Sequence, residues 1–272
     1  MESIPPPWRR TLGYVMETEG HVYAFSMAAN VLLSFFPFLI VIISLCRYVF
    51  HWNAAEQAIY LALDDYFPDA LGDFITRNLR ARVRPMEIGS LLLLLFTANG
   101  IFEPLEVALN RAWGITKNRT FVRNQIVSLG MIFLTGGLVL ASALLTAYNQ
   151  KALGQLGTNV FVASMLFKIA AVPMSMLALF IIYWRLPNGP VPVRPLIPVT
   201  FAVGMGLEAL KYVALALWPW MNVKFFNEYG PFYRSAIIVF LSFLASMIVL
   251  AGAEWAARSR REAALAGENP LH

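Results

Sequence analysis

The chain has 272 residues, of which 58% are hydrophobic and only 14% are charged, with a mean hydropathy of +0.61. A soluble domain usually carries about 25% charged residues, so this composition excludes an ordinary soluble protein and indicates a membrane protein. The net charge of +5 does not point to a nucleic-acid partner, because the basic residues stand mostly at the ends of apolar runs, where they set topology.

Apolar segments recur along the whole chain at a length that suits transmembrane helices. Crossing a bilayer takes about 20 helical residues, and six segments reach or approach this length. The sequence therefore predicts an all-α, polytopic membrane protein with about six transmembrane helices. The predicted spans are 24–46, 87–109, 125–148, 160–184, 196–218 and 232–254.

The first apolar run is too long for the apolar region of a cleaved signal peptide, which has about 7–15 residues, so we expect it to remain as the first helix. The predicted membrane domain covers 24–257, between a cytoplasmic segment 1–23 and a cytoplasmic tail 258–272. With this orientation, 11 Lys and Arg residues lie inside and 3 lie in the two short outside loops, although five arginines in the long connection 47–86 run against the rule.

The connection 47–86 contains a pattern typical of an amphipathic helix over 69–84. Its apolar residues share one helical face and its arginines share another. Such a helix suits the surface of a membrane with anionic headgroups, or it caps the helix bundle with its arginines in water, and both interpretations stay open. The arginines concerned are Arg77, Arg80 and Arg84.

Motifs for common chemistries are missing from the sequence. The three histidines, His21, His51 and His272, have no ligand-like spacing, and there is no phosphate-binding loop or nucleophile motif. We therefore expect no metal, no cofactor, no nucleic-acid partner and no enzymatic activity. Ala202 and Gly206 lie four apart in an apolar helix, a spacing that lets two helices approach closely.

The second predicted helix carries polar residues that a lipid-facing helix does not need. Asn99, Glu103, Glu106 and Asn110 are spaced 4, 3 and 4 apart, which predicts one shared face. A charge at mid-membrane costs about 2.5–3.5 kcal/mol, so this face should turn toward the bundle interior or toward water. Alternatively, the apolar part ends at Phe102 and residues 103–113 lie at the cytoplasmic interface.

Prolines and isolated polar residues mark further positions inside the predicted spans. A proline in a helix interior removes a hydrogen bond and clashes with the preceding turn, so we expect helix breaks or kinks at Pro104, Pro37 and Pro173. Intramembrane polar residues commonly pair with one another or line a substrate path. The remaining candidates are Asn30, Glu208, Lys211 and Glu254.

Three stretches give the chain a recognisable signature: SFFPFLIVIISL, FTANGIFEPLEVALNRAWGI and YGPFYRSAIIVFLSFLASMIVLAGAEW. From about residue 20 to residue 260 the chain resembles the YihY/BrkB family of bacterial inner-membrane proteins. The resemblance implies six helices, cytoplasmic termini and no agreed catalytic residues. The family was once labelled ribonuclease BN, a label regarded as a misassignment, and some members are linked to virulence. Matching positions are Glu106, Asn110, Trp113, Gly252 and Glu254.

Polar residues and helix breakers inside the membrane favour a transporter or exporter of a small solute or a lipid-like amphipathic substrate. No ATPase motif is present, so the energy would come from a gradient or a partner. A scaffold whose polar residues only lock helices together is the alternative, and a ribonuclease is the third hypothesis.

The charge count yields a topology prediction. Reporter fusions after Lys117 should give a cytoplasmic signal and fusions after Ala152 an external one, because basic residues stay on the cytoplasmic side. An external signal after Lys117 would contradict the six-helix arrangement.

Overall fold

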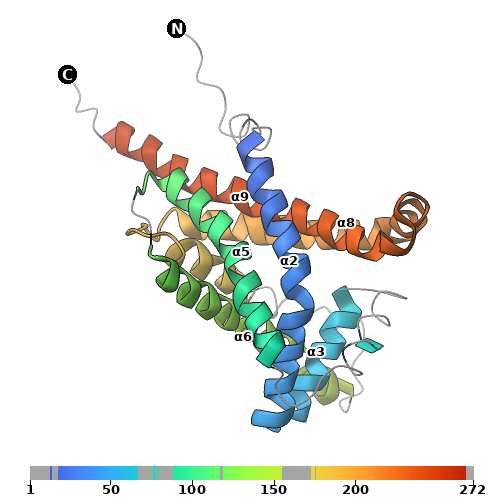
Figure 1. Ribbon diagram of the computed structural model, residues 1–272. Helices are drawn as coiled ribbons and strands as arrows, with labels where there is room; N and C mark the ends of the chain where they lie inside the picture. Colours follow the sequence, from blue (N-terminus) through green and yellow to red (C-terminus); the bar gives the residue numbers. More distant parts are fainter. Residues whose placement is uncertain are drawn as a thin grey trace, which may run out of the picture. The chain divides into compact units, whose positions relative to one another are not determined.

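The computed structural model describes Gly13 and residues 18–66, 76–77, 79, 88–116, 119–154, 173–174 and 176–267. Within these residues the chain is helical and contains no strand, which confirms the all-α prediction. The helices are α2 (Thr18–Ser44), α3 (Asn53–Tyr66), α5 (Ile88–Trp113), α6 (Phe121–Gly154), α8 (Leu196–Tyr229) and α9 (Tyr233–Gly267) (Figure 1). A π-helical turn, η1 (Leu45–Val49), continues α2, a 3-10 turn, η2 (Gly230–Phe232), joins α8 to α9, and Met176–Arg185 is also helical.

The helices coincide with the predicted spans. Five of the six spans lie inside a helix to within one residue, and the sixth, 160–184, falls partly outside the described residues. Two helical stretches of the described chain, Gly20–Val49 and Leu196–Arg258, are long and apolar enough to cross a membrane. At 34 residues α8 is about 51 Å long, which exceeds the roughly 30 Å of a hydrocarbon core. The number of crossings stays a prediction.

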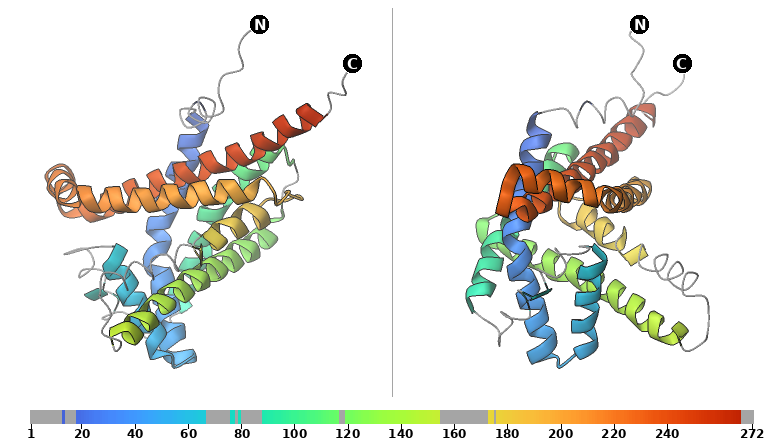
Figure 2. Two further views of the ribbon diagram at one scale, coloured as in Figure 1. Left: turned by 180° about the vertical axis from the view of Figure 1, so that it is seen from behind. Right: turned by 90° about the vertical axis from the view of Figure 1, so that its right-hand side faces the viewer.

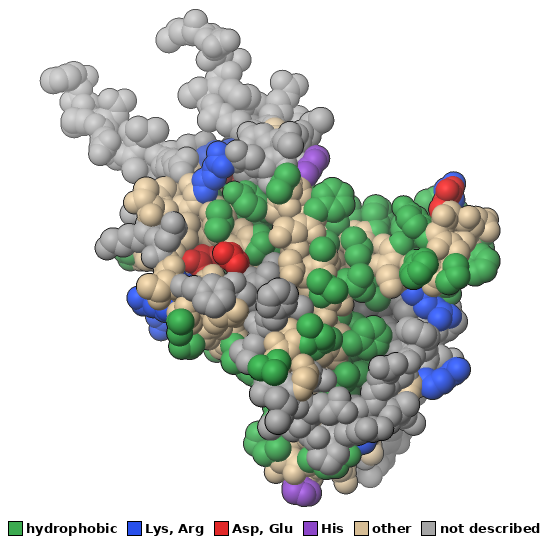
Figure 3. Space-filling model, viewed as in Figure 1, with side chains coloured by type: hydrophobic (Ala, Val, Ile, Leu, Met, Phe, Trp, Pro, Cys, Tyr) green, Lys and Arg blue, Asp and Glu red, His purple; other side chains and the backbone are tan. Residues whose placement is uncertain are grey.

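One side of α8 exposes large apolar side chains along its whole length. Soluble proteins rarely expose an apolar patch larger than a few hundred Å², whereas a helix in lipid does so without cost. Figure 3 shows hydrophobic side chains over much of the visible face of the α8–α9 hairpin. These side chains are Ile197, Phe201, Met205, Val213, Leu217, Trp220, Val223 and Phe226.

The contacts divide the chain into two units. The first contains Met1–Val31, Asn99–Ser128 and Leu179–His272, and the second contains Leu32–Ala98 and Leu129–Ala178. In the first unit α8 and α9 form an antiparallel hairpin, which reverses at Gly230 with a positive φ of 52° (Figure 2). A Cβ on Gly206 would lie 3.2 Å from Cγ2 of Ile248, so the predicted close approach is confirmed at Gly206, whereas Ala202 is exposed.

A third helix joins this hairpin through a buried tyrosine. Tyr183 is fully buried, and its hydroxyl donates to the carbonyl of Val249 (2.7 Å). Beside it, a Cβ on Gly252 would lie 2.2 Å from Cγ2 of Val203 and 2.9 Å from the Tyr183 hydroxyl. Glycine at 252 therefore allows Met176–Arg185, α8 and α9 to meet at one point.

The second unit contains a helix that the sequence analysis did not predict. In α3 the buried residues Ala55, Ile59 and Leu63 are four apart, which is the spacing of an amphipathic helix and could have revealed it. Arg47 of η1 donates through Nε to Oε2 of Glu56 (3.0 Å) and through Nη2 to the other carboxylate oxygen. This bidentate ion pair ties α3 to the end of α2.

The predicted helix breaks are not found at two of the three prolines. Pro37 lies inside α2 and Pro104 lies inside α5, and both helices continue through them. A proline removes only one backbone hydrogen bond, and neighbouring helices in membrane proteins compensate for the loss, so the helix does not have to end. Pro173 is helical, and the residues before it lie outside the described chain, so a break there stays a prediction.

The predicted amphipathic helix over 69–84 lies mostly outside the described residues. Thr76, Arg77 and Leu79 are helical. Leu79 is buried and Arg77 is exposed, so these two residues lie on different faces, as the pattern requires. Arg80 and Arg84 are outside the described chain, and the contact with headgroups stays a prediction.

The close approach at Gly252 can be tested by adding a methyl group. Gly252→Ala should destabilise the protein by about 1–3 kcal/mol, because its Cβ clashes with Val203. The measurement is the thermal unfolding temperature of the purified protein in detergent. Gly137→Ala is the matched control, since nothing lies within 4 Å of its Cβ, and it should not lower that temperature. Adding Val203→Ala should partly restore Gly252→Ala, and a neutral Gly252→Ala would contradict the close approach.

Candidate site: a buried ion pair at the end of α5

The second half of α5 buries two of the four polar residues predicted to share a face. Glu106 is 5% exposed and Asn110 is 6% exposed, whereas Glu103 is exposed. The side chain of Asn99 lies outside the description. The prediction of one common inward face is therefore correct for Glu106 and Asn110 and wrong for Glu103.

Helix geometry explains why Glu103 departs from its neighbours. Three residues of an α-helix turn through about 300°, so Glu103 and Glu106 are about 60° apart around the axis. Glu106 lies at the edge of the buried face, and this rotation places Glu103 on the exposed strip that also contains Val107 and Arg111. Spacing alone did not show where the buried face ends.

Glu106 is paired with an arginine from the connection between α5 and α6. Nη1 of Arg119 lies 3.2 Å from Oε2 of Glu106, and the two side chains are only 11% and 7% exposed. The same guanidinium approaches two backbone carbonyls through Nη2, those of Pro187 (3.3 Å) and Arg185 (3.4 Å). Arg119 thus connects the end of α5 to the chain that follows Met176–Arg185.

Asn110 makes a second connection of the same kind. Its Oδ1 accepts a hydrogen bond from the backbone N–H of Asn188 (2.8 Å). One residue further on, a Cβ on Gly189 would lie 3.1 Å from Cδ1 of Ile115, so the two connections are in direct contact. Glu106, Asn110, Arg119 and Asn188 form what we call the polar latch.

The latch places a full charge pair in an apolar environment. Ion pairs withdrawn from water cost several kcal/mol per ion unless close partners compensate, and here both side chains have them. The indole Nε1 of Trp113, one turn beyond Asn110, is buried without a hydrogen-bond partner within the described structure. A donor in this position is available to an acceptor that arrives from outside the protein.

The other predicted polar residues are distributed over three helices. In α2 the amide of Asn30 donates to the carbonyl of Ser26 (2.8 Å). Glu208 and Lys211 lie one turn apart in α8 and are half buried. Glu254 of α9 accepts a hydrogen bond from Nη2 of Arg258 (3.0 Å), four residues later. No contact in the described structure joins these residues to the polar latch, so they do not form one site with it.

Sequence reasoning missed two of the four latch residues. Arg119 was counted only as a topology marker, and Asn188 was not considered. The partners are separated by 13 residues for Arg119 and Glu106 and by 78 residues for Asn188 and Asn110, so no local pattern links them. Among the residues that the structure describes, no group of three or more His, Cys, Asp or Glu is placed to hold a metal.

Comparison with known proteins identifies the family. The profile of a family described as "Virulence factor BrkB" matches residues 12–270. The chain belongs to the BrkB family. The match includes every residue of the polar latch, and it agrees with the resemblance seen in the sequence.

Three BrkB relatives show the range of the similarity. The "Putative ribonuclease-like protein YfkH" of Bacillus subtilis (strain 168) is 26% identical over 93% of this chain and 95% of its own length. A "UPF0761 membrane protein" of Chromohalobacter salexigens is 24% identical over 88% of this chain. A second "UPF0761 membrane protein", from Acinetobacter baylyi, is 26% identical over 74%. The chain spans 59% and 49% of the lengths of these two membrane proteins. No solved structure matches the chain.

The latch can be tested by removing its charges one at a time. Arg119→Gln should destabilise the protein by about 3–5 kcal/mol, because the Glu106 carboxylate is left buried without its partner. Glu106→Gln should cost less, since Arg119 keeps the two carbonyls, and the double variant should cost less than the sum of the two. Thermal unfolding in detergent measures all three.

The control removes a charge from an exposed pair. Lys224 and Glu228 pair at 2.8 Å but are 54% and 56% exposed, so Lys224→Gln should leave the unfolding temperature unchanged. If the two latch substitutions were simply additive, the ion pair would not be coupled in the folded protein.

Proposed function

We propose that this BrkB-family membrane protein is a multi-pass protein of the bacterial inner membrane, with both termini in the cytoplasm, that moves a small solute or a lipid-like amphipathic substrate along a polar path at α5. The observation that carries the proposal is the Glu106–Arg119 pair. A membrane anchor needs no buried charges, and ionisable residues inside membrane proteins usually belong to substrate or ion pathways.

The arrangement of the first unit supports the proposed orientation. The connection 114–120 and the connection 186–195, both expected inside, touch each other through the polar latch. The turn between α8 and α9 lies at the other end of α8, about 51 Å away along the helix axis. The segments assigned to one side of the membrane by charge are therefore neighbours in the fold.

In the proposed mechanism the latch closes the path. Arg119 holds the connection 186–195 against the end of α5, and opening requires the ion pair and the Asn110–Asn188 hydrogen bond to separate. A substrate with an anionic or hydrogen-bonding group would compensate for this separation, because it offers Arg119 and Trp113 new partners.

The scaffold hypothesis remains the alternative, and one observation favours it. The guanidinium of Arg119 contacts groups from two different parts of the chain, which is also how a purely structural clamp is built. The ribonuclease hypothesis reflects the printed name of the relative YfkH. Metal-dependent RNA cleavage by the purified protein, lost on substituting Glu103 or Glu106, would support that hypothesis.

A transport assay with a lockable latch tests the proposal. In a Cys46→Ser background, cysteines at Ile115 and Gly189 should form a disulfide, because the Gly189 Cβ would lie 3.3 Å from Cγ1 of Ile115. Reconstituted vesicles are then assayed with fluorescent phospholipids for transbilayer movement and with radiolabelled solutes for uptake. We expect oxidation to abolish the flux and reduction to restore it.

The matched control locks a contact that should not move. Cysteines at Gly206 and Ile248 join α8 to α9, where the Gly206 Cβ would lie 3.2 Å from Ile248, and this disulfide should leave the flux intact. Flux that persists through the oxidised 115–189 pair would refute the latch as the gate. Folded protein that moves no probe in either state would favour the scaffold.

A further inference from the structure

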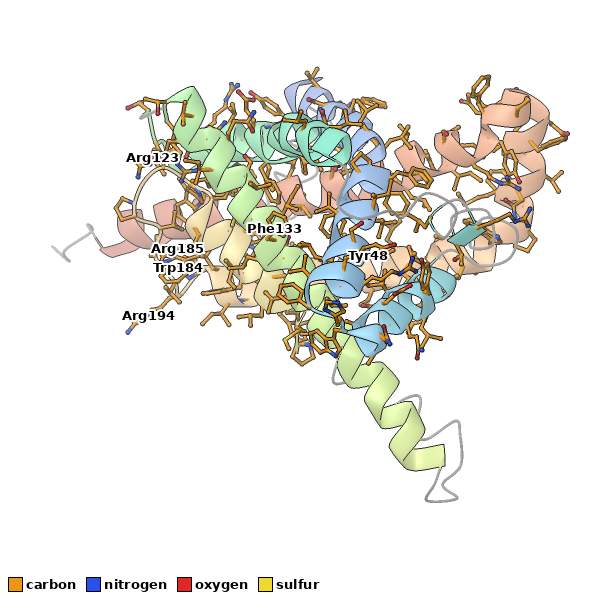
Figure 4. All side chains as sticks on the ribbon, turned by 60° about the horizontal axis from the view of Figure 1, so that its bottom comes forward. Tyr48, Arg123, Phe133, Trp184, Arg185 and Arg194 are labelled. Carbon is orange, nitrogen blue, oxygen red and sulfur yellow. The ribbon has the colours of Figure 1, made fainter. Side chains whose placement is uncertain are left out.

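Three exposed arginines project from the same end of the first unit. Arg123 lies in the first turn of α6, Arg185 ends the helical stretch Met176–Arg185, and Arg194 lies just before α8. Figure 4 shows them along one edge, together with Trp184. We call Arg123, Trp184, Arg185 and Arg194 the arginine surface.

The polar latch fixes the two parts of this surface relative to each other. Arg119, one turn before Arg123, bonds to the carbonyls of Arg185 and Pro187. The connection that follows is rigid, because four of its residues are prolines, whose φ is fixed. These are Pro187, Pro190, Pro192 and Pro195. The guanidinium groups are therefore held in place before any ligand arrives.

The positive charge of this surface has no acidic counterpart nearby in the chain. From residue 107 to residue 207 the sequence contains eight Lys and Arg residues and no Asp or Glu. Within the described residues, no ion pair involves Arg123, Arg185 or Arg194. The first turns of α6 and α8 lie here too, and the positive ends of their dipoles add to the potential. The surface therefore attracts anions.

An apolar strip begins where the arginines end. Ile197 and Phe201, each 59% exposed, and Met205, 50% exposed, lie four residues apart on α8 directly after Arg194. Arg185 stacks on the ring of Trp184 at 4.4 Å, and tryptophan favours the headgroup layer of a bilayer. Phosphate groups are bound well by arginine, whose donors match two phosphate oxygens at once. A ligand that fits has an anionic head and hydrocarbon tails.

We propose that the arginine surface binds anionic phospholipids, with the phosphate at Arg123, Arg185 and Arg194 and the acyl chains along Ile197, Phe201 and Met205. This binding is independent of the transport proposed above, because it requires neither opening of the latch nor movement of a substrate. It would anchor this end of the protein in one leaflet and hold the connection 186–195 at the membrane surface.

Native mass spectrometry of the detergent-solubilised protein tests the proposal. Titration with phosphatidylglycerol and phosphatidylcholine gives the affinity for each, and the wild type should prefer phosphatidylglycerol. Each basic residue near an anionic lipid contributes roughly fivefold, so Arg185→Gln with Arg194→Gln should weaken phosphatidylglycerol binding about 25-fold. Phosphatidylcholine binding should stay the same.

The control variant loses the same charge at the opposite end of α8. Lys224→Gln with Arg234→Gln removes two positive charges near the α8–α9 turn and should retain the affinity for phosphatidylglycerol. An equal loss in this control would mean that only net charge matters and would overturn the site. Glycerol phosphate at the same concentrations should not compete, and competition by it would assign the surface to soluble phosphates instead. If the double variant does not fold, Arg194→Gln alone should still show a loss of about fivefold, and an unchanged affinity would overturn the proposal.

Discussion

The withdrawal of Glu106 and Arg119 from water is the constraint on which the first unit depends. Two opposite charges lie 3.2 Å apart with little solvent around them, so neither is tolerable without the other. To satisfy the carboxylate, the connection between α5 and α6 must fold back over the end of α5. To satisfy the rest of the guanidinium, the chain after Arg185 must bring two carbonyls to the same place. One ion pair thus determines the course of two connections.

Apolar packing supplies the remainder of that unit. The hairpin of α8 and α9 is close because glycines occupy the contacts at 206 and 252, and Tyr183 adds a hydrogen bond that a lipid-facing helix could not provide. Outside these contacts α8 presents bulky apolar side chains outward, which fits a helix whose solvent is lipid. Charge therefore organises the end of the unit, and close packing organises its length.

Local pattern was enough to predict the helices but not the site. Runs of apolar residues predicted the spans because each helix in lipid must be apolar along its own sequence, whatever its neighbours are. Glu106 and Asn110 were found because buried polar residues in such runs are rare. Glu103 was misplaced, since a rotation of about 60° separates a buried position from an exposed one. Arg119 and Asn188 escaped notice because their partners are distant in sequence, and Pro104 was overrated because tertiary packing compensates for one lost hydrogen bond.

The shortness of η2 has a consequence for how the protein is made. Only Gly230–Phe232 separates two helices of 34 and 35 residues, so there is no hydrophilic loop to carry across the membrane. Lys224 and Glu228 travel as a neutralised pair at 2.8 Å, and Arg234 lies against the ring of Tyr233. In the proposed orientation the insertion machinery can therefore accept α8 and α9 as one preformed hairpin. Assembly would then begin with a finished pair of helices at the C-terminus, against which the earlier segments dock.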